Sequence, residues 1–305
     1  MKRRKSTIGE LVAAAETRGC PLWQVVLEKE ERLQKRDRKD IWRTMEKYWT
    51  VMKESLDAGL QPGNRSLSGL VGEEGVLLTR YLEKAEPLSG SGSVLAAARA
   101  MGVAVVNASQ GRIVAAPTAG SCGILPAVLA TVAERTGASE EAVIGALFTA
   151  AGVGMVIDEQ AGTAGAEGGC QAECGSASCM AAVAAAEMAG GTPRQAVNAG
   201  ALALKNFLGL VCDPVAGLVE VPCVKRNAIG AAVALLAADM ALAGIESKIP
   251  LDEVIQAMKE VGDALPDSLK ETSLAGLAAT PTAREIEKRI EAGDLGNNPP
   301  GLLKV

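Results

Sequence analysis

The sequence from Val94 onward alternates alanine-rich stretches with glycine-rich turns, and this pattern constrains the fold more than any other feature. Small side chains allow helix axes to approach closely, so we expect tightly packed helices. Strand signals are few, and the best candidates are the short segments 112–116 and 218–224. The sequence therefore predicts an all-α fold, predominantly helical, with few short strands.

Several helix boundaries are indicated by residues that cap helix ends. Ser139 precedes two glutamates, an arrangement that favours a helix start because the acids face the positive end of the helix dipole. Thr192-Pro-Arg-Gln and Thr282-Ala-Arg-Glu match the capping box, in which the first and fourth side chains satisfy free N–H groups. Pro250, followed by further acids, predicts another helix start.

Composition divides the chain into two regions. Residues 1–59 carry hydrophobic residues at helical spacing, and Gly59 is placed to end the last helix of this region. Residues 60–305 begin with a stretch, 60–94, that is rich in glycine and serine and suits either a linker or an anion-binding loop. We expect an N-terminal helical segment packed on a larger helical domain, the two forming one structural unit.

The overall charge and hydrophobicity exclude several classes of function. The net charge is -5 and aromatic residues make up 2%, whereas a nucleic-acid-binding protein normally needs a basic face and aromatic rings for stacking. The longest nearly apolar run, 142–157, is shorter than the roughly 20 residues of a membrane span. The basic start at Met1 is not followed by an apolar signal-peptide core. We therefore expect a cytoplasmic protein that binds neither nucleic acid nor membrane.

The chain contains seven cysteines and no histidine. An odd number of cysteines in a chain without secretory features favours free thiols or metal ligands over a disulfide framework. The lack of histidine excludes a Ser-His-Asp triad, a Cys-His pair and a histidine-ligated zinc within this polypeptide. Proton transfer must therefore use another side chain, a metal-bound group or a residue from another chain.

Three segments, 116–127, 167–180 and 212–228, place glycine, hydroxyl or cysteine residues beside an expected helix start. Helix N-termini offer unpaired N–H groups and a partial positive charge, which suit a substrate carboxylate or an anionic cluster. A helix cap or an ion pair would be the purely structural interpretation of the same residues. The candidates for contact with a substrate in these segments are Thr118, Gly120, Ser121, Ser176, Arg226 and Asn227.

Three further motifs are Arg65-Ser-Leu-Ser-Gly-Leu, Asn107-Ala-Ser-Gln-Gly-Arg-Ile-Val-Ala-Ala-Pro-Thr and Leu269-Lys-Glu-Thr-Ser-Leu-Ala-Gly-Leu-Ala. Together with the three segments above, these motifs resemble the iron–sulfur-dependent L-serine dehydratases, specifically the alpha chain of the two-subunit form. The resemblance covers nearly the whole chain. It implies a [4Fe-4S] cluster held by Cys170, Cys212 and Cys223, L-serine as substrate, and a heterodimer with a beta subunit that supplies further substrate-site residues.

Three cysteine ligands would suit catalysis better than electron transfer. Four protein thiolates saturate the irons, whereas three leave one iron open to act as a Lewis acid on a substrate hydroxyl. The resemblance implies an L-serine ammonia-lyase, in which a base removes the Cα proton, water leaves, and the product hydrolyses to pyruvate and ammonia. Glu167 and Glu173 are the carboxylates nearest to Cys170, and neither is identified as the base.

Spacing alone leaves alternatives open. One alternative is a local metal site made by Cys170, Cys174 and Cys179. Another is a core role, because a buried cysteine outside a site usually behaves as a small hydrophobic residue. A related lyase that acts on cysteine or threonine is the alternative within enzymes, and an iron–sulfur redox protein with a fourth ligand is the alternative outside them.

The sequence departs from the family's pattern in two places. Gly72-Glu-Glu-Gly replaces the common Gly-Gly-Asp-Ala, which puts the role of that loop in doubt. The chain ends in Leu-Lys-Val305, without the terminal cysteine that approaches the cluster in some single-chain relatives.

Overall fold

The structure, a computed structural model, describes residues 6–293. These residues form helices and loops without a β-strand, which confirms the predicted all-α fold. The first α-helices are α1 (Ile8–Arg18), α2 (Leu22–Gln34), α3 (Arg38–Gly59), α4 (Glu74–Leu82), α5 (Ser91–Ala108) and α6 (Ile124–Thr136). The later ones are α7 (Glu140–Ala161), α8 (Gly165–Gly168), α9 (Ser176–Met188), α10 (Pro193–Lys205), α11 (Cys223–Leu242), α12 (Leu251–Ala264) and α13 (Pro281–Glu291). The chain also has four short helical segments of other types. These are the π-helix η1 (Gln171–Gly175) and the 3-10 helices η2 (Val215–Gly217), η3 (Asp267–Leu269) and η4 (Gly276–Ala279), all within residues 6–293.

The two predicted strands are wrong. Residues 112–116 form a loop between α5 and α6, and residues 218–224 form a turn that runs into α11. A strand needs a neighbouring strand to satisfy its backbone groups, and residues 6–293 provide none. Within the described part of the chain, the one isolated β-bridge joins Cys212 to Lys270.

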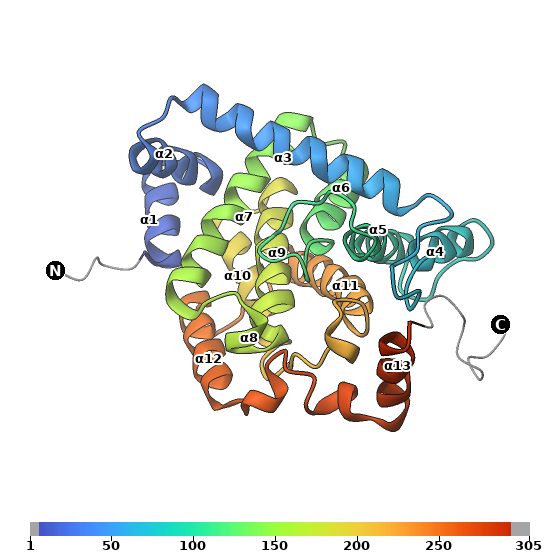
Figure 1. Ribbon diagram of the computed structural model, residues 1–305. Helices are drawn as coiled ribbons and strands as arrows, with labels where there is room; N and C mark the ends of the chain where they lie inside the picture. Colours follow the sequence, from blue (N-terminus) through green and yellow to red (C-terminus); the bar gives the residue numbers. More distant parts are fainter. Residues whose placement is uncertain (1–5, 294–305) are drawn as a thin grey trace.

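Helix α9 lies at the centre of the molecule, with α6, α7, α10 and α11 packed around it (Figure 1). Every residue from Ser176 to Ala186 is buried, and most of them are small. A Cβ atom on Gly200 of α10 would lie 2.5 Å from Val183 and 3.0 Å from the Cys179 sulfur. The alanine and glycine bias therefore has the predicted consequence of close helix packing, and it leaves Cys179 as a core residue.

The predicted helix ends are mostly correct. Ser139 caps α7, Thr192 forms a capping box on α10, Pro250 precedes α12, and α3 ends at Gly59. The capping box predicted at Thr282 is wrong. Helix α13 begins two residues earlier than this box implies, at Pro281, because proline favours the first helical position, and its cap is Thr280.

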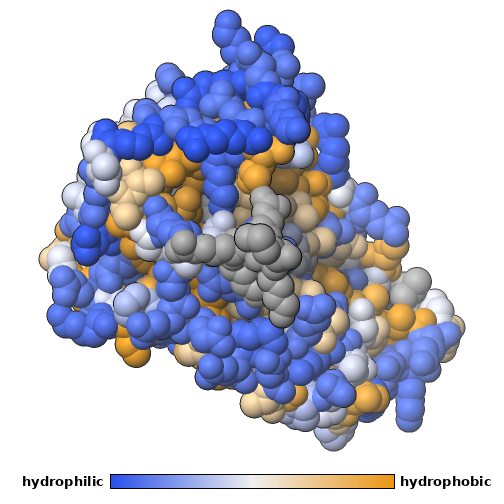
Figure 2. All heavy atoms as spheres, turned by 90° about the vertical axis from the view of Figure 1, so that its left-hand side faces the viewer, coloured by the Kyte–Doolittle hydropathy of each residue, from blue (hydrophilic) through white to orange (hydrophobic). Residues whose placement is uncertain are grey.

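The helices of residues 6–59 are attached to the rest of the molecule by carboxylates from distant helices. Asp252 of α12 accepts hydrogen bonds from the N–H groups of Ile8 and Gly9, and Glu187 of α9 accepts one from Leu22. Side chains from α1, α2 and α3 belong to the main hydrophobic core. Figure 2 shows the face that carries α1 and α2, where hydrophilic side chains cover the outer helices and apolar side chains gather in the recess between them.

Two described helices, α5 and α7, are long and apolar enough to cross a membrane by length and composition alone. Helix α7 is longer than the apolar run 142–157, so the helix reaches the length of a membrane span although the run alone does not. Most of the apolar window of α7 and half of that of α5 are buried inside the molecule. Both are core helices of this fold.

Helices α3 and α5 cross at a contact between two glycines. A Cβ on Gly102 would lie 2.8 Å from the backbone of Gly59, which cannot move aside as a side chain can. We expect Gly102→Ala to lower the free energy of unfolding by roughly 2–3 kcal/mol, as overpacking of a close contact does. Urea denaturation measures this. Gly9→Ala in α1 is the matched control, because its Cβ would make an ordinary contact of 3.5 Å, and equal effects would contradict the explanation.

Candidate active site

The three predicted cluster ligands are contributed by three separate segments and are all buried. Cys170 directly precedes η1, Cys212 lies in the loop after α10, and Cys223 is the first residue of α11. Burial raises the pKa of Cys223 to about 12, and the charge of Cys170 adds to this increase. Burial also raises the pKa of Cys212, with contributions from Glu173 and Cys170. These mutual effects show that the fold brings the three thiols into one electrostatic environment.

Cys174 lies in the same group of thiols. Its sulfur is 3.4 Å from that of Cys170, one helical turn before it. The hydrogen bond with Cys174 lowers the pKa of Cys170 against the effect of burial, and the positive charge of Arg226 lowers it further. Cys174 is fully buried, as expected of a small hydrophobic residue, but its sulfur faces a predicted ligand rather than the core alone.

Arg226 links the cysteine-bearing segments. Its guanidinium donates hydrogen bonds to the Val211 carbonyl and to the Asp213 carboxylate, both at 2.9 Å, so it holds both sides of Cys212. Its positive charge also favours the thiolate form of Cys170, whose pKa it lowers. The structural interpretation of Arg226 as an ion-pair partner is therefore correct, and the residue acts on the geometry of the predicted ligands.

Asn227 connects the first and third segments. Its side-chain oxygen accepts a hydrogen bond from the Gly123 N–H at 3.0 Å, and its amide donates to the Gly120 and Cys223 carbonyls at 2.8 and 3.0 Å. These bonds use both amide hydrogens and one lone pair of the side-chain oxygen. The structure thus places Asn227 as a bridge between the loop before α6 and Cys223.

Thr118, Gly120 and Ser121 lie in the loop before α6. The hydroxyls of Thr118 and Ser121 are 3.1 Å apart and hydrogen-bond to each other, while the N-cap of α6 is Gly123. The alternative that these hydroxyls cap the helix is therefore wrong. Within residues 6–293, the backbone N–H groups of Ala119, Gly120 and Ser121 have no acceptor. Consecutive free N–H groups suit a carboxylate ligand.

Glu173 is the carboxylate that faces this loop. A Cβ on Gly120 would lie 3.3 Å from one of its oxygens, and a Cβ on Gly165 would lie 2.8 Å from the other. Burial raises the pKa of Glu173 above its ordinary value, although hydrogen bonding to Thr118 opposes this. Glu167, the other candidate base, is exposed. Glu173 is thus the carboxylate that the structure places among the predicted site residues.

Two serines near the start of α9, the candidate Ser176 and its neighbour Ser178, differ in their partners. The Ser178 hydroxyl donates to the Gly230 carbonyl at 2.9 Å, which is a structural role between α9 and α11. The Ser176 hydroxyl is fully buried and, within the described part of the chain, has no hydrogen-bond partner. A buried polar group without a partner is costly, and it indicates a ligand or water that the protein normally holds.

The donor set fits an iron–sulfur cluster by its chemistry. No three His, Cys, Asp or Glu side chains of residues 6–293 surround a single point as a mononuclear ion requires, and this applies equally to the local trio of Cys170, Cys174 and Cys179. The ligands of a cluster bind different irons, so their sulfurs need not converge on one point. Buried thiols from three separate segments match that requirement.

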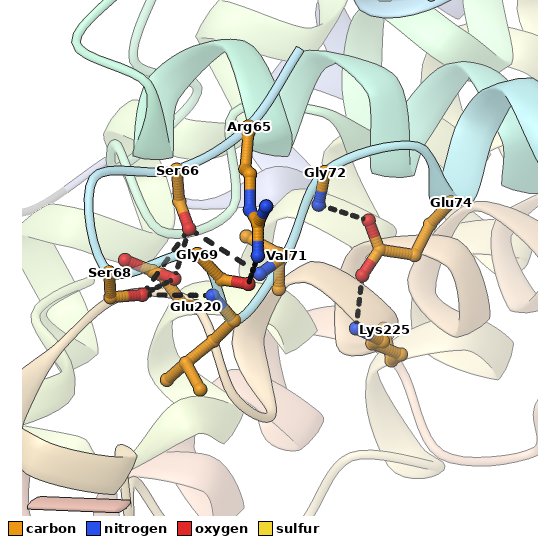
Figure 3. A network of polar contacts seen from close by, with 10 residues as sticks. Arg65, Ser66, Ser68, Gly69, Val71, Gly72, Glu74, Glu220 and Lys225 are labelled. Carbon is orange, nitrogen blue, oxygen red and sulfur yellow. Dashed lines mark hydrogen bonds and ion pairs between the residues drawn. The ribbon is translucent and has the colours of Figure 1, made fainter. Parts of the chain in front are cut away.

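Two functional neighbours were not predicted from the sequence. Asp213 directly follows Cys212, and an acid beside a candidate ligand was the signal that could have identified it. Glu220 lies between Cys212 and Cys223 and accepts hydrogen bonds from Ser66 and Ser68 of a distant loop (Figure 3). No local pattern in the sequence indicates that pairing.

Comparison with known proteins identifies the family of the chain. The chain matches the family model described as serine dehydratase alpha chain over residues 17–278. It is 48% identical over 290 residues to the probable L-serine dehydratase alpha chain of Bacillus subtilis, which covers 95% of this chain and 96% of that one. The L-serine dehydratase alpha chain of Peptoniphilus asaccharolyticus is 41% identical, with 95% and 99% covered. L-serine dehydratase TdcG of Escherichia coli is 37% identical over 88% of this chain and 60% of its own length. The chain belongs to the serine dehydratase alpha chain family.

Proposed function

We propose that this protein is the alpha chain of a two-subunit L-serine dehydratase, an ammonia-lyase that converts L-serine into pyruvate and ammonia with a [4Fe-4S] cluster. The observation that carries the proposal is the common environment of Cys170, Cys212 and Cys223 beside a loop of free N–H groups. Bound there, the cluster would supply a Lewis-acidic iron that helps the serine hydroxyl to leave.

The chain's own residues would bind and orient the substrate. The free N–H groups of Gly120 and Ser121 would hold the serine carboxylate. Glu173 lies against the same loop, and its carboxylate would then face the Cα proton of the bound serine. Arg226 and Asn227 position the cysteines and the loop rather than reacting themselves. Because the chain has no histidine, Glu173 is the group best placed to accept the proton.

The surface next to the site supports a protein partner. Val219 is exposed and lies 3.5 Å from the position of a Cβ on Gly120, and Leu67 is exposed between the two serines that bind Glu220. Leu277 is also exposed, and its N–H donates to Asp213 at 2.7 Å. We infer that a beta subunit covers this apolar rim, and that the pair works in the cytoplasm.

Pyruvate formation by the anaerobically purified pair of chains tests the proposal. Serine, threonine and cysteine should be compared in one assay, because the related lyases differ in the amino acid that they use. We expect serine to give the highest kcat/KM. No turnover of any of the three by protein that carries its cluster would favour an iron–sulfur redox protein.

The choice of ligands is tested with two cysteine variants. We expect Cys212→Ala to abolish the cluster's visible absorbance, because three thiolates are needed to hold it, whereas Cys174→Ala should keep it. Iron and sulfide content per chain measures both. Loss of the cluster in Cys174→Ala would instead identify a four-thiolate site, as the contact between Cys170 and Cys174 would permit.

Glu173→Gln tests the proton acceptor. We expect kcat to fall by about a hundredfold or more, as removal of a general base does, while the cluster absorbance stays unchanged. Since burial raises the pKa of Glu173, the acidic limb of the pH–rate profile should lie above the ordinary Glu range and vanish in the variant. Glu167→Gln, in the same motif but exposed, is the control. Equal rates in the two variants would exclude Glu173 as the base.

The partner surface is tested with Leu67→Asp. We expect affinity for the beta subunit to fall by about tenfold or more, because a charge would enter the apolar part of the interface. Leu33→Asp in α2 changes another exposed leucine, on a different helix, and should leave binding unchanged. Isothermal titration calorimetry measures both, and unaffected binding by Leu67→Asp would rule out this face.

A further inference from the structure

The loop of residues 64–74 is held together by hydrogen bonds between its own backbone groups, in addition to its contacts with the rest of the molecule. The Ser66 N–H donates to the Val71 carbonyl, and the Gly69 N–H donates to the Ser66 carbonyl, both at 3.0 Å. Gly69 has a φ of 74°, a conformation that favours glycine. This rigid turn holds the hydroxyls of Ser66 and Ser68 on one side (Figure 3).

Both hydroxyls bind one carboxylate oxygen. Ser66 and Ser68 donate to the same oxygen of Glu220, at 2.6 and 2.5 Å. Glu220 is only 5% exposed. Hydrogen bonds to a buried charged group are strong, and removing them leaves the charge without compensation. The loop therefore fixes Glu220 firmly.

Glu220 is part of the turn that leads into Cys223. Its carbonyl accepts a hydrogen bond from the Val224 N–H at 3.0 Å, so the turn that holds Glu220 is bonded to the first turn of α11. Its position is thus coupled to the backbone of Val224, the residue directly after Cys223.

A second contact lies on the other side of Cys223. Lys225 forms an ion pair with Glu74 at 2.5 Å, and Glu74 also accepts the Gly72 N–H at 2.7 Å. Glu74 belongs to the Gly72-Glu-Glu-Gly turn that departs from the family's common sequence. The loop therefore contacts the chain just before and just after Cys223.

We propose that residues 64–74 are a two-point clamp that fixes Cys223, with Ser66, Ser68 and Glu220 as positioning residues for this cluster ligand. The inner point is the pair of hydroxyls on Glu220, and the outer point is the ion pair between Glu74 and Lys225. The consequence for the cluster rests on the proposed function. The clamp itself does not depend on the proposed function, because its contacts fix the protein backbone whether or not a cluster is bound.

The test measures the Cys223 thiol in the protein prepared without iron. We expect Ser66→Ala/Ser68→Ala to raise the rate of iodoacetamide labelling of Cys223 by about tenfold, because the first turn of α11 opens more often. Labelling of Cys122 in the same chain, located by peptide mass spectrometry, should not change. Ser55→Ala removes a buried hydroxyl from α3 and serves as the matched control. Ser66→Thr/Ser68→Thr keeps the hydroxyls and should restore slow labelling.

Lys225→Met gives a second, independent variant, since Lys225 is half exposed and its loss does not threaten folding. We expect a smaller increase in Cys223 labelling, about twofold to fivefold, as for the loss of a partly exposed ion pair. In the protein carrying its cluster, both variants should lose iron in air faster than the wild type, at an unchanged melting temperature for Lys225→Met. Wild-type labelling rates at Cys223 in every folded clamp variant would overturn the clamp. A wild-type chain that never binds iron would instead overturn the proposed function, and the labelling result would still stand.

Discussion

The guanidinium of Arg226 joins parts of the chain that the sequence keeps well apart. It bonds to Val211 and Asp213 on either side of Cys212, it reaches Cys170, and it lies in the same helix as Cys223. Asn227, the next residue, continues the connection to the loop at Gly120. One turn of α11 thus connects the cysteines with the loop whose free N–H groups would bind a carboxylate. The small side chains of the surrounding alanine-rich helices allow this turn to pack close to α9.

Burial sets the chemistry of the thiols in this arrangement. It raises the pKa values of Cys212 and Cys223, and so disfavours the thiolate form of both when no iron is bound. A cluster binds thiolates, and its assembly must release the thiol protons. The same burial keeps bulk water away from the site. A partner on the rim near Val219 would extend that exclusion to the substrate.

Local features were predictable from the sequence and long-range ones were not. Caps such as Ser139 and Thr192 depend on neighbouring residues, so their patterns gave correct helix starts, whereas Thr282 failed because Pro281 takes the first helical position. The three cysteines were selected by family resemblance, since their spacing alone allowed a local trio with Cys174. The pairing of Ser66 with Glu220 joins residues that are 154 positions apart, and no local signal encodes it.

In the proposed site, three thiolates would leave one iron free for L-serine. Electron paramagnetic resonance of the reduced cluster, recorded with and without L-serine, would detect this binding. We expect L-serine to shift the signal of the wild-type protein and D-serine at the same concentration to shift it less. An unchanged spectrum at saturating L-serine, in protein with a full complement of iron, would contradict an open iron at this site.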